Sequence, residues 1–536
     1  MVLLAAIDQG TSSSRFLIYD SDSGELVTSH QIEVRQIFPQ AGWVEMNPRE
    51  ILETIEACMD RVCDNLRNMG ISLSEIVSIG IANQRETTIV WDRTTGKPLY
   101  NAIVWLDTRT AELAQDSIDR TPTQDKDYFK AKTGLPIHPY FSALKLKWLI
   151  DNVPEVQEAL SAGNLLFGTV DSWIIWKLTG NHVTDVTNAS RTLLLDLHKR
   201  KWSTQLCEFF EIPQSILPTI HSSAEVYGRL SWGPLKNVPI SGCLGDQQAA
   251  MVGHGCLQVG DTKSTYGTGT FMLCNTGVKA INSKSGLLTT VGFQFGSHSP
   301  VCYALEGSGS IGGNVVRFLR DNMGFISTNS EVEELASSVP NTSDVYFVPC
   351  FAGLYTPYWD STARGTICGL TQCSTKAHIA RAALKAVAFQ TSEMTEAIQR
   401  DLDGVGKIHT LKIDGGMTAN KLFNQMQADA LGRPIVVSKM AEISGWGAAV
   451  AAGIGAHQLS LDAFSEFTNQ VIRYSAEMPE DQRLEEMAKW EAAVDRARNW
   501  AAIEHHTPIK PMPLPSPSPK VSITNPLFHK PAGQLV

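Results

Sequence analysis

The chain opens with two short apolar runs separated by a polar segment. Residues 3–7 (LLAAI) and 16–19 (FLIY) have the length of β-strands, and the residues between them have the composition of a turn. We therefore predict a β-hairpin over residues 3–20. A similar strand–turn–strand pattern returns at residues 261–276 (DTKSTYGTGTFMLCNT), roughly 250 residues later, and this indicates a duplicated domain.

Helical patterns alternate with the strand patterns. Residues 47–66 space their apolar side chains as an amphipathic helix, with Asn47 as the N-cap of a capping box completed by the glutamate three residues later. A second helical pattern covers residues 140–152, where we expect Lys145 and Lys147 to face solvent. This mixture of strands and helices predicts an α/β fold rather than an all-helical one.

The length of 536 residues exceeds what one hydrophobic core usually supports, and this predicts two large domains. We assign residues 1–255 and 256–457 to them, with the boundary near 253–262. Beyond residue 457 the strand pattern is lost, and we expect a helical extension over 458–503. Residues 504–536 are rich in proline and lack the apolar residues for a core, so we expect a largely disordered or extended tail.

Composition and charge narrow the class of partner. A net charge of −10 argues against a nucleic-acid or acidic membrane surface and favours small metabolites. No signal peptide and no transmembrane segment is visible. The ten cysteines are scattered without a CxxC pair, as is typical of reduced thiols rather than of disulfides or a zinc site. We therefore expect a cytoplasmic protein; association with a mitochondrial surface has no visible signal.

The turn of the first hairpin has the residue types that bind phosphate. Gly10 permits close approach of the backbone, the hydroxyls of residues 11–13 follow it, and Arg15 can neutralise phosphate charge. Asp8 at the end of the first strand suits Mg²⁺, which prefers a few carboxylates together with phosphate and water. The plain alternative is that these residues simply form a good turn.

Polar residues also follow three other strand patterns, where open α/β sheets place their ligands. The first set is the elbow at residues 83–86, where Arg85 and Glu86 form either a surface ion pair or a set of donors and acceptors for a polyol. The second is Asp246, which opens a helix after a strand and could serve only as its cap. The third is an Asp–Gly–Gly turn at 414–416, before a helix that begins near residues 418–420.

Two common nucleotide motifs do not explain the chain. The sequence has no GxxxxGK[ST], so a P-loop is excluded. A GxGxxG pattern occurs at Gly307, Gly309 and Gly312, with acidic residues about twenty positions on. It lies in the middle of the second half without a continuing dinucleotide fold, so we interpret it as a glycine-rich turn.

Taken together and in order, the motifs over residues 3–455 resemble the FGGY carbohydrate kinases, and among them those that act on glycerol. The motifs are DQGTSSSR, NQRETTIVW, NAIVW, PYFS, GTVDSWIIWKLTG, TNASRT, GDQQAA, YGTGTF, LTTVGF, ARGTICGLT and DGGMTANK. The resemblance implies two duplicated actin-like (ribonuclease-H-like) domains with an interdomain cleft. It also implies ATP-dependent, Mg²⁺-assisted phosphorylation of glycerol to sn-glycerol 3-phosphate, with ATP and ADP as nucleotide partners, in a homo-oligomer (dimer or tetramer).

The resemblance further implies roles for individual residues. Asp246 would be the catalytic base, and Asp8 would lie near the metal. Glycerol would be bound by Arg85, Glu86, Trp105, Tyr140, Asp246, Gln247 and Phe271. The nucleotide would be contacted by Thr11, Ser12, Ser13, Arg15, Thr268, Gly313, Gly416 and Asn420.

The chain departs from the family pattern at several positions. Lys385, Ser392 and Trp446 stand where other residues are usual in the nucleotide domain, the turn at 306–313 is richer in glycine, and residues 106–108 differ beside the substrate pocket. These differences leave two alternatives open. One is a catalytically weakened paralogue that acts as a binding or scaffold protein, and the other is a kinase for a related polyol or ketose.

Overall fold

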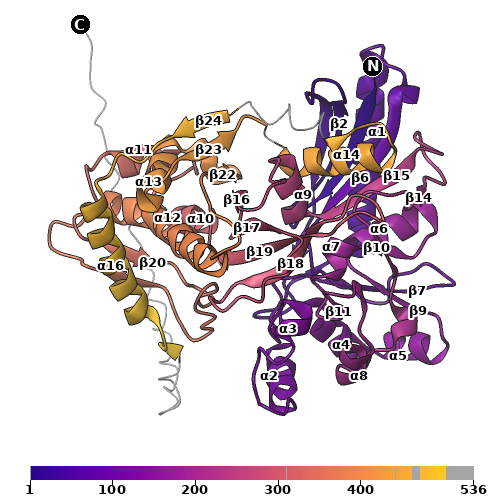
Figure 1. The fold of residues 1–536 in the computed structure, drawn as a ribbon, viewed down its shortest axis with the longest axis horizontal. Helices are drawn as coiled ribbons and strands as arrows, with labels where there is room; N and C mark the ends of the chain where they lie inside the picture. The colour runs from indigo at the N-terminus through magenta and orange to yellow at the C-terminus, as the bar shows by residue number, and fades with distance from the viewer. Residues whose placement is uncertain (1, 310, 441, 462–470, 502–536) are drawn as a thin grey trace, which may run out of the picture.

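The computed structural model describes residues 2–309, 311–440, 442–461 and 471–501, and two β-sheets organise them (Figure 1). The first sheet contains, in spatial order, β14 (Gly228–Arg229), β15 (Pro239–Gly245), β6 (Ile76–Asn83), β1 (Leu3–Gln9), β2 (Ser13–Asp20) and β3 (Leu26–Glu33). The second contains β18 (Leu288–Phe293), β19 (Cys302–Gly309), β17 (Thr270–Gly277), β16 (Thr262–Tyr266), β22 (Leu411–Asp414), β23 (Ile435–Ser438) and β24 (Val471–Tyr474).

The two sheets repeat one topology. In the first, β1, β2 and β3 are successive antiparallel neighbours, while β6 lies parallel to β1 and β15 lies parallel to β6. In the second, β16, β17 and β19 are antiparallel neighbours, while β22 lies parallel to β16 and β23 lies parallel to β22. Both predicted hairpins are therefore confirmed, and the repeat is the duplicated ribonuclease-H-like arrangement that we expected.

Helices and shorter strands surround the sheets. The helices of the first half are α1 (Pro48–Asn68), α2 (Ala111–Asp119), α3 (Lys130–Thr133), α4 (Ser142–Asn152), α5 (Pro154–Ser161), α6 (Val170–Thr179), α7 (Val186–Ala189), α8 (Thr204–Phe209) and α9 (Asp246–Gly253). Those of the second half are α10 (Asn314–Asp321), α11 (Glu331–Ser337), α12 (Lys376–Asp401), α13 (Lys421–Leu431), α14 (Ile443–Gly455) and α16 (Glu480–Ala497).

The shorter strands and 3-10 turns lie mostly in the first half. The strands are β4 (Gln36–Ile37), β5 (Glu45–Met46), β7 (Ile89–Asp92), β8 (Ala102–Ile103), β9 (Leu165–Gly168), β10 (Val183–Asp185), β11 (Leu195–Asp196), β12 (Lys201–Trp202), β13 (Thr219–His221), β20 (Tyr346–Val348) and β21 (Thr366–Cys368). The 3-10 turns are η1 (Leu73–Glu75), η2 (Gln214–Ile216) and η3 (Gly416–Ala419).

Helix α14 lies in sequence between β23 and β24 of the second sheet but packs against the first sheet, beside α9 (Figure 1). Small residues permit this close contact. A Cβ added to Gly80 of β6 would lie 2.0 Å from the carbonyl oxygen of Ala448, and one added to Gly447 would lie 1.8 Å from that of Ala249. A division of the chain at residue 255 therefore does not coincide with the division of the cores, because α14 completes the core of the first domain.

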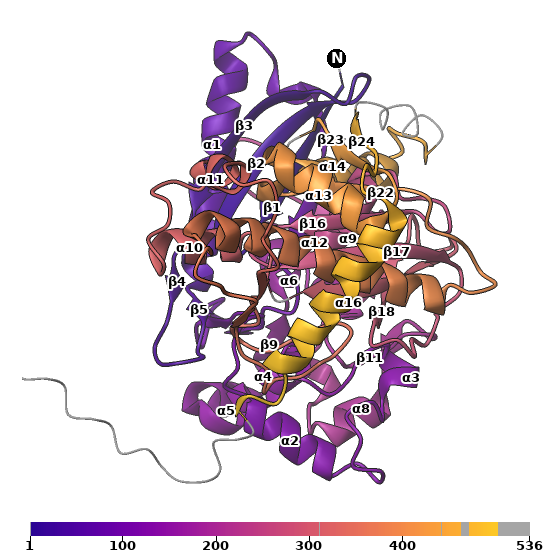
Figure 2. The ribbon, with the colours of Figure 1, turned by 90° about the vertical axis from the view of Figure 1, so that its left-hand side faces the viewer.

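The expected helical extension over 458–503 is present as α16, but the expectation was wrong at residues 471–474, which form strand β24. Strand β24 pairs antiparallel with β23 and extends the second sheet, while α16 lies across α12 and α13 (Figure 2). Val471 and Ile472 of β24 are exposed, so this edge strand lacks the alternating pattern that would have identified it. Trp490 and Val494 anchor α16 in the core. The proline-rich tail lies outside the described residues.

Two side-chain expectations were also wrong. Asn47 does cap α1, accepting from the amide of Arg49, but Glu50 accepts from the amide of Arg35 instead of closing a capping box. Lys145 of α4 is fully buried, because its ammonium donates to the carbonyl oxygens of Pro139 and Tyr140, both at 2.6 Å.

The second lysine of α4 is largely covered as well. Lys147 pairs with Asp151 and Glu211, and only 14% of its side chain is exposed.

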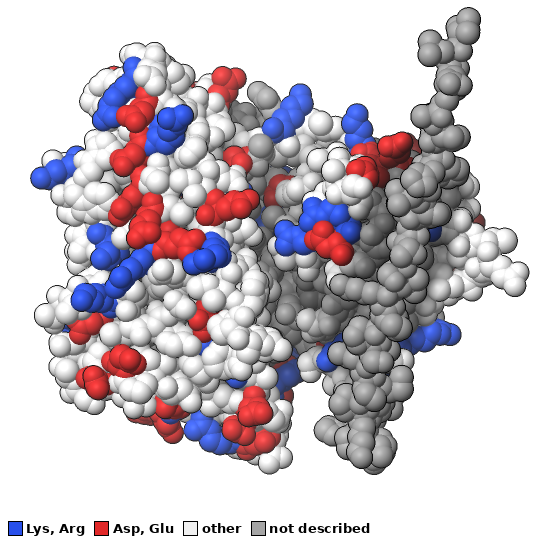
Figure 3. All heavy atoms as spheres, turned by 180° about the vertical axis from the view of Figure 1, so that it is seen from behind, with Lys and Arg blue, Asp and Glu red and all other residues white. Residues whose placement is uncertain are grey.

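Several global expectations can be compared with the described residues. All ten cysteines are free thiols. No described helix combines the length and apolar character that crossing a bilayer requires. On the face drawn in Figure 3, lysine and arginine side chains are interspersed with aspartate and glutamate.

Candidate active site

The strand ends of both sheets open onto one cleft of about 660 Å³. All but two of the predicted site residues line it: Asp8, Thr11, Ser12, Ser13, Arg15, Arg85, Glu86, Trp105, Tyr140, Asp246, Gln247, Thr268, Phe271 and Gly416. The exceptions, Gly313 and Asn420, line an adjoining pocket of about 390 Å³ that shares Thr268 and Gly416 with the cleft. The structure therefore brings the predicted residues into two neighbouring pockets that share part of their lining.

The first hairpin presents its polar turn to this cleft. The amide of Gly10 donates to the carbonyl oxygen of Ser13 at 2.9 Å and closes the turn. Arg15 pairs with Asp8 at 3.1 Å. Burial raises the pKa of Asp8 to about 6; the positive charge of Arg15 opposes this shift, and the negative charges of Glu442 and Asp246 add to it. A buried acid among like charges is a place where a divalent cation would be stabilised.

Three aromatic rings from separate segments enclose the other end of the cleft. The ring of Trp105 lies 5.6 Å from those of Tyr140 and Phe271, at steep angles of 75° and 73°. Its indole N–H donates to the hydroxyl of Thr11 at 2.9 Å, which ties the aromatic group to the first hairpin. Such an enclosure has apolar faces for the carbon atoms of a small polyol.

The elbow after β6 carries two buried charges that do not pair with each other. Glu86 has a φ of 58°, a left-handed conformation that is uncommon for residues other than glycine, and the backbone bends sharply there. Arg85 donates to both carboxylate oxygens of Glu306 at 2.6 and 2.8 Å, and Arg191 donates to Glu86 at 2.6 Å. The surface ion-pair interpretation of Arg85 and Glu86 is therefore wrong.

The sequence interpretation missed Arg191 and Glu306. Arg191 follows α7 and also donates to Glu306, at 3.2 Å, while Glu306 belongs to β19 of the second sheet. Burial acts to raise the pKa of Glu306, but Arg191 and Arg85 together lower it to about 2. A charged residue inside an apolar strand pattern was the available signal, because such a residue is normally buried with a partner.

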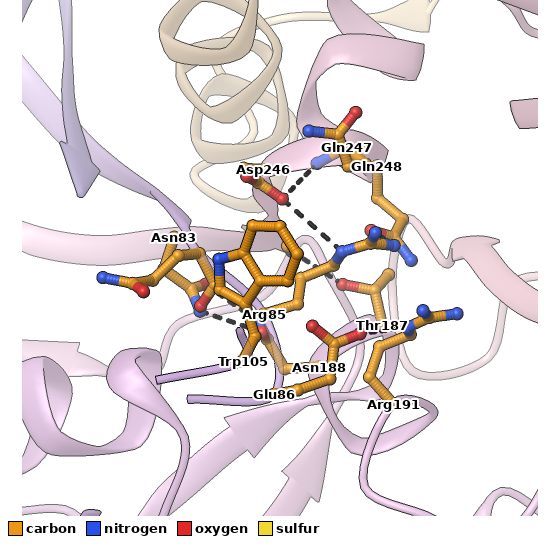
Figure 4. A network of polar contacts seen from close by, with 12 residues as sticks. Asn83, Arg85, Glu86, Trp105, Thr187, Asn188, Arg191, Asp246, Gln247 and Gln248 are labelled. Atoms are coloured by element: carbon orange, nitrogen blue, oxygen red, sulfur yellow. Dashed lines mark hydrogen bonds and ion pairs between the residues drawn. The ribbon is translucent and has the colours of Figure 1, made fainter. Parts of the chain in front are cut away.

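Asp246 is the first residue of α9, and 28% of its side chain remains exposed to the cleft. It accepts from the amide of Gln247 at 2.7 Å, whereas the N-cap position belongs to Gly245. The Nε atom of Arg85 lies 3.5 Å from its Oδ1 atom (Figure 4). Burial raises the pKa of Asp246 against the positive charges of Arg85 and Lys263, and this makes the carboxylate a better proton acceptor.

A second polar network links Asp246 to the Asp–Gly–Gly turn, and the sequence interpretation missed most of it. Lys263 of β16 donates to the side-chain oxygens of Gln247 and, at 2.9 Å, Thr265. Thr265 donates to Asp414 at 3.1 Å, and His254 is hydrogen-bonded to the same carboxylate at 2.6 Å. Burial lowers the pKa of Lys263 to about 8. The orientation of Gln247 is thus fixed by a residue of the second sheet.

The adjoining pocket is built on the second hairpin. The amides of Gly312 and Gly313 donate to the carbonyl oxygens of Thr268 and Gly267, at 2.9 and 2.7 Å. Gly307 and Gly309 belong to strand β19, so the interpretation of the GxGxxG segment as a turn was wrong for these two residues. A Cβ on Gly312 would lie 2.4 Å from the carbonyl oxygen of Gly269, so this glycine permits the loop after β19 to pack onto the hairpin. This explains the pattern without a dinucleotide fold.

Three positions that depart from the family pattern, Lys385, Ser392 and Trp446, are absent from both described cavity linings, whereas Gly313 of the glycine-rich segment lines the adjoining pocket. Ser392 donates to the carbonyl oxygen of Ala430, Lys385 pairs with Glu486, and Trp446 packs on Tyr19.

The departures beside the substrate pocket also have a structural explanation. Asp107 accepts from the amide of Val44 at 2.6 Å and pairs with Arg109 at 2.8 Å, so it supports the loop that carries Trp105.

Comparison with known proteins gives consistent matches along the chain. Residues 3–253 match the N-terminal domain of the FGGY family of carbohydrate kinases, and residues 262–456 match its C-terminal domain. A Caenorhabditis elegans protein named "Probable glycerol kinase" is 68% identical, covering 94% of this chain and 100% of that protein. A "Glycerol kinase" of Brucella anthropi is 48% identical, covering 93% and 99%.

Solved structures agree with these sequence matches. The crystal structure of Plasmodium falciparum glycerol kinase with ADP is 39% identical and has a TM-score of 0.85, covering 93% of this chain and 98% of that one. A ligand-bound xylulose kinase of Lactobacillus acidophilus, at 21% identity and a TM-score of 0.79, shares the fold.

Proposed function

Because this chain belongs to the FGGY family of carbohydrate kinases, we propose that it transfers the γ-phosphoryl group of ATP to glycerol, forming sn-glycerol 3-phosphate and ADP. One observation carries the proposal. Buried charges, three aromatic rings, Asp246 and the polar hairpin all line one cleft. Relatives named glycerol kinase at 68% and 48% identity support glycerol as the acceptor.

The reaction forms a bond between a glycerol oxygen and the γ-phosphorus and breaks the bond from that phosphorus to the β,γ-bridging oxygen. Asp246 accepts the proton that the attacking hydroxyl loses. Arg85, Glu86 and Gln247 orient the polyol, and the rings hold its carbon atoms. Phosphoryl transfer depends mainly on alignment and on stabilisation of negative charge, which the hairpin amides and Arg15 supply.

Mg²⁺ fits the Asp8 end of the cleft, where the negative charges of Glu442 and Asp246 add to the burial that raises the pKa of Asp8. Asp8 would hold the ion, directly or through water. When bound, Mg²⁺ neutralises phosphate charge.

The nucleotide extends from the first hairpin into the adjoining pocket. Thr11, Ser12, Ser13 and Arg15 face the phosphates, while Gly313 and Asn420 line the far part of the space. The free thiols suit a reducing compartment, and we place the reaction in the cytoplasm.

The test is ADP release by the purified chain in the presence of Mg²⁺ and ATP. Glycerol is compared with xylulose, ribulose, glyceraldehyde and no acceptor. We expect ADP release that depends on glycerol and far exceeds that with the two ketoses. If a ketose is used in preference to glycerol, the chain is a kinase for that ketose. If a folded chain binds glycerol but shows no turnover with any acceptor, the result favours a binding protein.

A further inference from the structure

Glu306 of the second sheet is bonded to Arg85, which lines the glycerol end of the cleft. Glu306 belongs to β19 and is fully buried. Its two carboxylate oxygens accept from the two terminal nitrogens of Arg85, at 2.6 and 2.8 Å, and one of them also accepts from Arg191 at 3.2 Å. One carboxylate of the second domain therefore holds two arginines of the first.

Arg85 also faces the carboxylate that we propose as the base. The Nε atom of Arg85 lies 3.5 Å from Oδ1 of Asp246, a longer distance than the 2.6 Å between the guanidinium and Glu306. A carboxylate that is tightly paired with a guanidinium accepts a proton less readily, because the pairing stabilises its charged form. The position of the Arg85 side chain thus decides how free Asp246 is to act.

The balance of buried charges around Arg85 makes the position of its side chain depend on Glu306. Arg85 and Arg191 are matched by Glu86 and Glu306, and all four side chains are buried. Without the charge of Glu306, two guanidiniums would share Glu86, and Asp246 would be the nearest remaining carboxylate for Arg85. A buried charge without a partner is unfavourable, so Arg85 would be drawn toward Asp246.

We propose that Glu306 is a positioning residue, which holds the Arg85 guanidinium so that the Asp246 carboxylate stays free to accept the substrate proton. The inference rests on the proposed kinase function and adds a residue of the second domain to the glycerol site. Glu306 acts through Arg85 and does not itself touch the reacting atoms.

The first experiment measures kcat, the KM for glycerol and the KM for ATP in Glu306→Gln, which keeps the side-chain shape and removes its charge. We expect kcat to fall on the order of 100-fold, as for partial loss of a general base, and the glycerol KM to rise. The ATP KM and ADP affinity should change less than about threefold, because the nucleotide pocket lies elsewhere. Glu306→Asp serves as a second variant if the glutamine variant does not fold.

A double-mutant cycle with Arg85→Met tests whether Glu306 acts through Arg85. Once the guanidinium is absent, Glu306→Gln should lower kcat by no more than about threefold beyond Arg85→Met alone. If instead the two losses multiply, Glu306 does not act through Arg85 and the inference is overturned.

Glu393→Gln is the matched control, because Glu393 is also buried in the second domain but bonds to Tyr358 outside the cleft. We expect near-normal kcat in this variant. If Glu306→Gln loses no more activity than the control, or loses ADP affinity in parallel with kcat, its role is structural and the inference is wrong. Absence of glycerol-dependent turnover in the unsubstituted chain would instead overturn the proposed function, and this inference with it.

Discussion

The two domains have the same sheet but different chemistry at equivalent strand ends. In the first sheet, β6 lies parallel to the first hairpin strand and ends in Asn83, before the charged elbow of Arg85 and Glu86. In the second, β22 has the same relation to β16 and ends in Asp414, before two glycines. The sheet thus provides the frame, and the loops that follow its strands determine which ligand each half receives.

The paired hairpins differ in a similar way. The turn of the first carries hydroxyls, and an Asp8–Arg15 ion pair joins its strands. The turn of the second holds Gly267 and Gly269 against the Gly312 loop. Charged and hydroxyl side chains can bind the transferred phosphoryl group, whereas glycines without side chains permit close approach of a nucleotide to the backbone. We therefore expect substitutions at the elbow of Arg85 and Glu86 and substitutions at the Gly312 loop to affect different kinetic constants.

The largest effect is expected at the boundary between the two halves, where Asp246→Asn removes the proposed base. The amide keeps the shape of the side chain, so the free energy of unfolding in urea should stay within about 1 kcal/mol. The rate of glycerol-dependent ADP release should fall roughly 10³-fold. Full activity in a folded variant would show that another group accepts the proton.

The next effect is expected in the first domain, where Glu86→Gln weakens the polyol site. The glycerol KM should rise roughly 10- to 100-fold, because Arg191 loses the charge of its partner, while the ATP KM changes less than about twofold. Glu45→Gln is a control of equal burial, since Glu45 pairs with Arg109 outside the cleft. If the glycerol KM and the ATP KM rise in parallel in Glu86→Gln, the elbow does not act on glycerol binding alone.

A smaller effect, on the ATP KM instead of the glycerol KM, is expected from Gly312→Ala in the second domain. The added Cβ would force the loop away from the Gly269 carbonyl, lowering the free energy of unfolding by about 1–3 kcal/mol and raising the ATP KM roughly 10-fold. The glycerol KM should remain near its original value. Gly267→Ala is the control for stability, because its added Cβ meets nothing within 4 Å. Equal destabilisation by the two variants would show that this contact is unimportant.

The smallest kinetic effect is expected from Lys385→Met, at a position that departs from the family pattern. Lys385 pairs with Glu486 of α16 and is absent from the described cavity linings. Its loss should cost about 1–3 kcal/mol of stability, because both side chains are largely buried, but should change the ATP KM less than twofold. A large change in the ATP KM would show that Lys385 does affect nucleotide binding.

The sequence was sufficient for features that depend on neighbouring residues. Both hairpins, the strand–Asp246–helix unit and the Asp–Gly–Gly turn could be recognised because strand length, turn composition and helix starts are local properties. The residues of the cleft were identified largely from motifs at these strand ends. Their convergence on one cleft follows from the duplicated topology, and the topology was implied by the family resemblance.

Tertiary structure decided the features that depend on distant partners. Arg191 and Glu306 are separated by more than a hundred residues, and only the folded structure brings β19 within side-chain reach of the segments that follow α7 and β6. The burial of Lys145 depends on two carbonyl groups aimed at its ammonium. The placement of α14 on the first sheet depends on glycines in two halves of the chain. Local patterns specify elements, whereas the partners of buried charges and the contacts between elements exist only after the chain has folded.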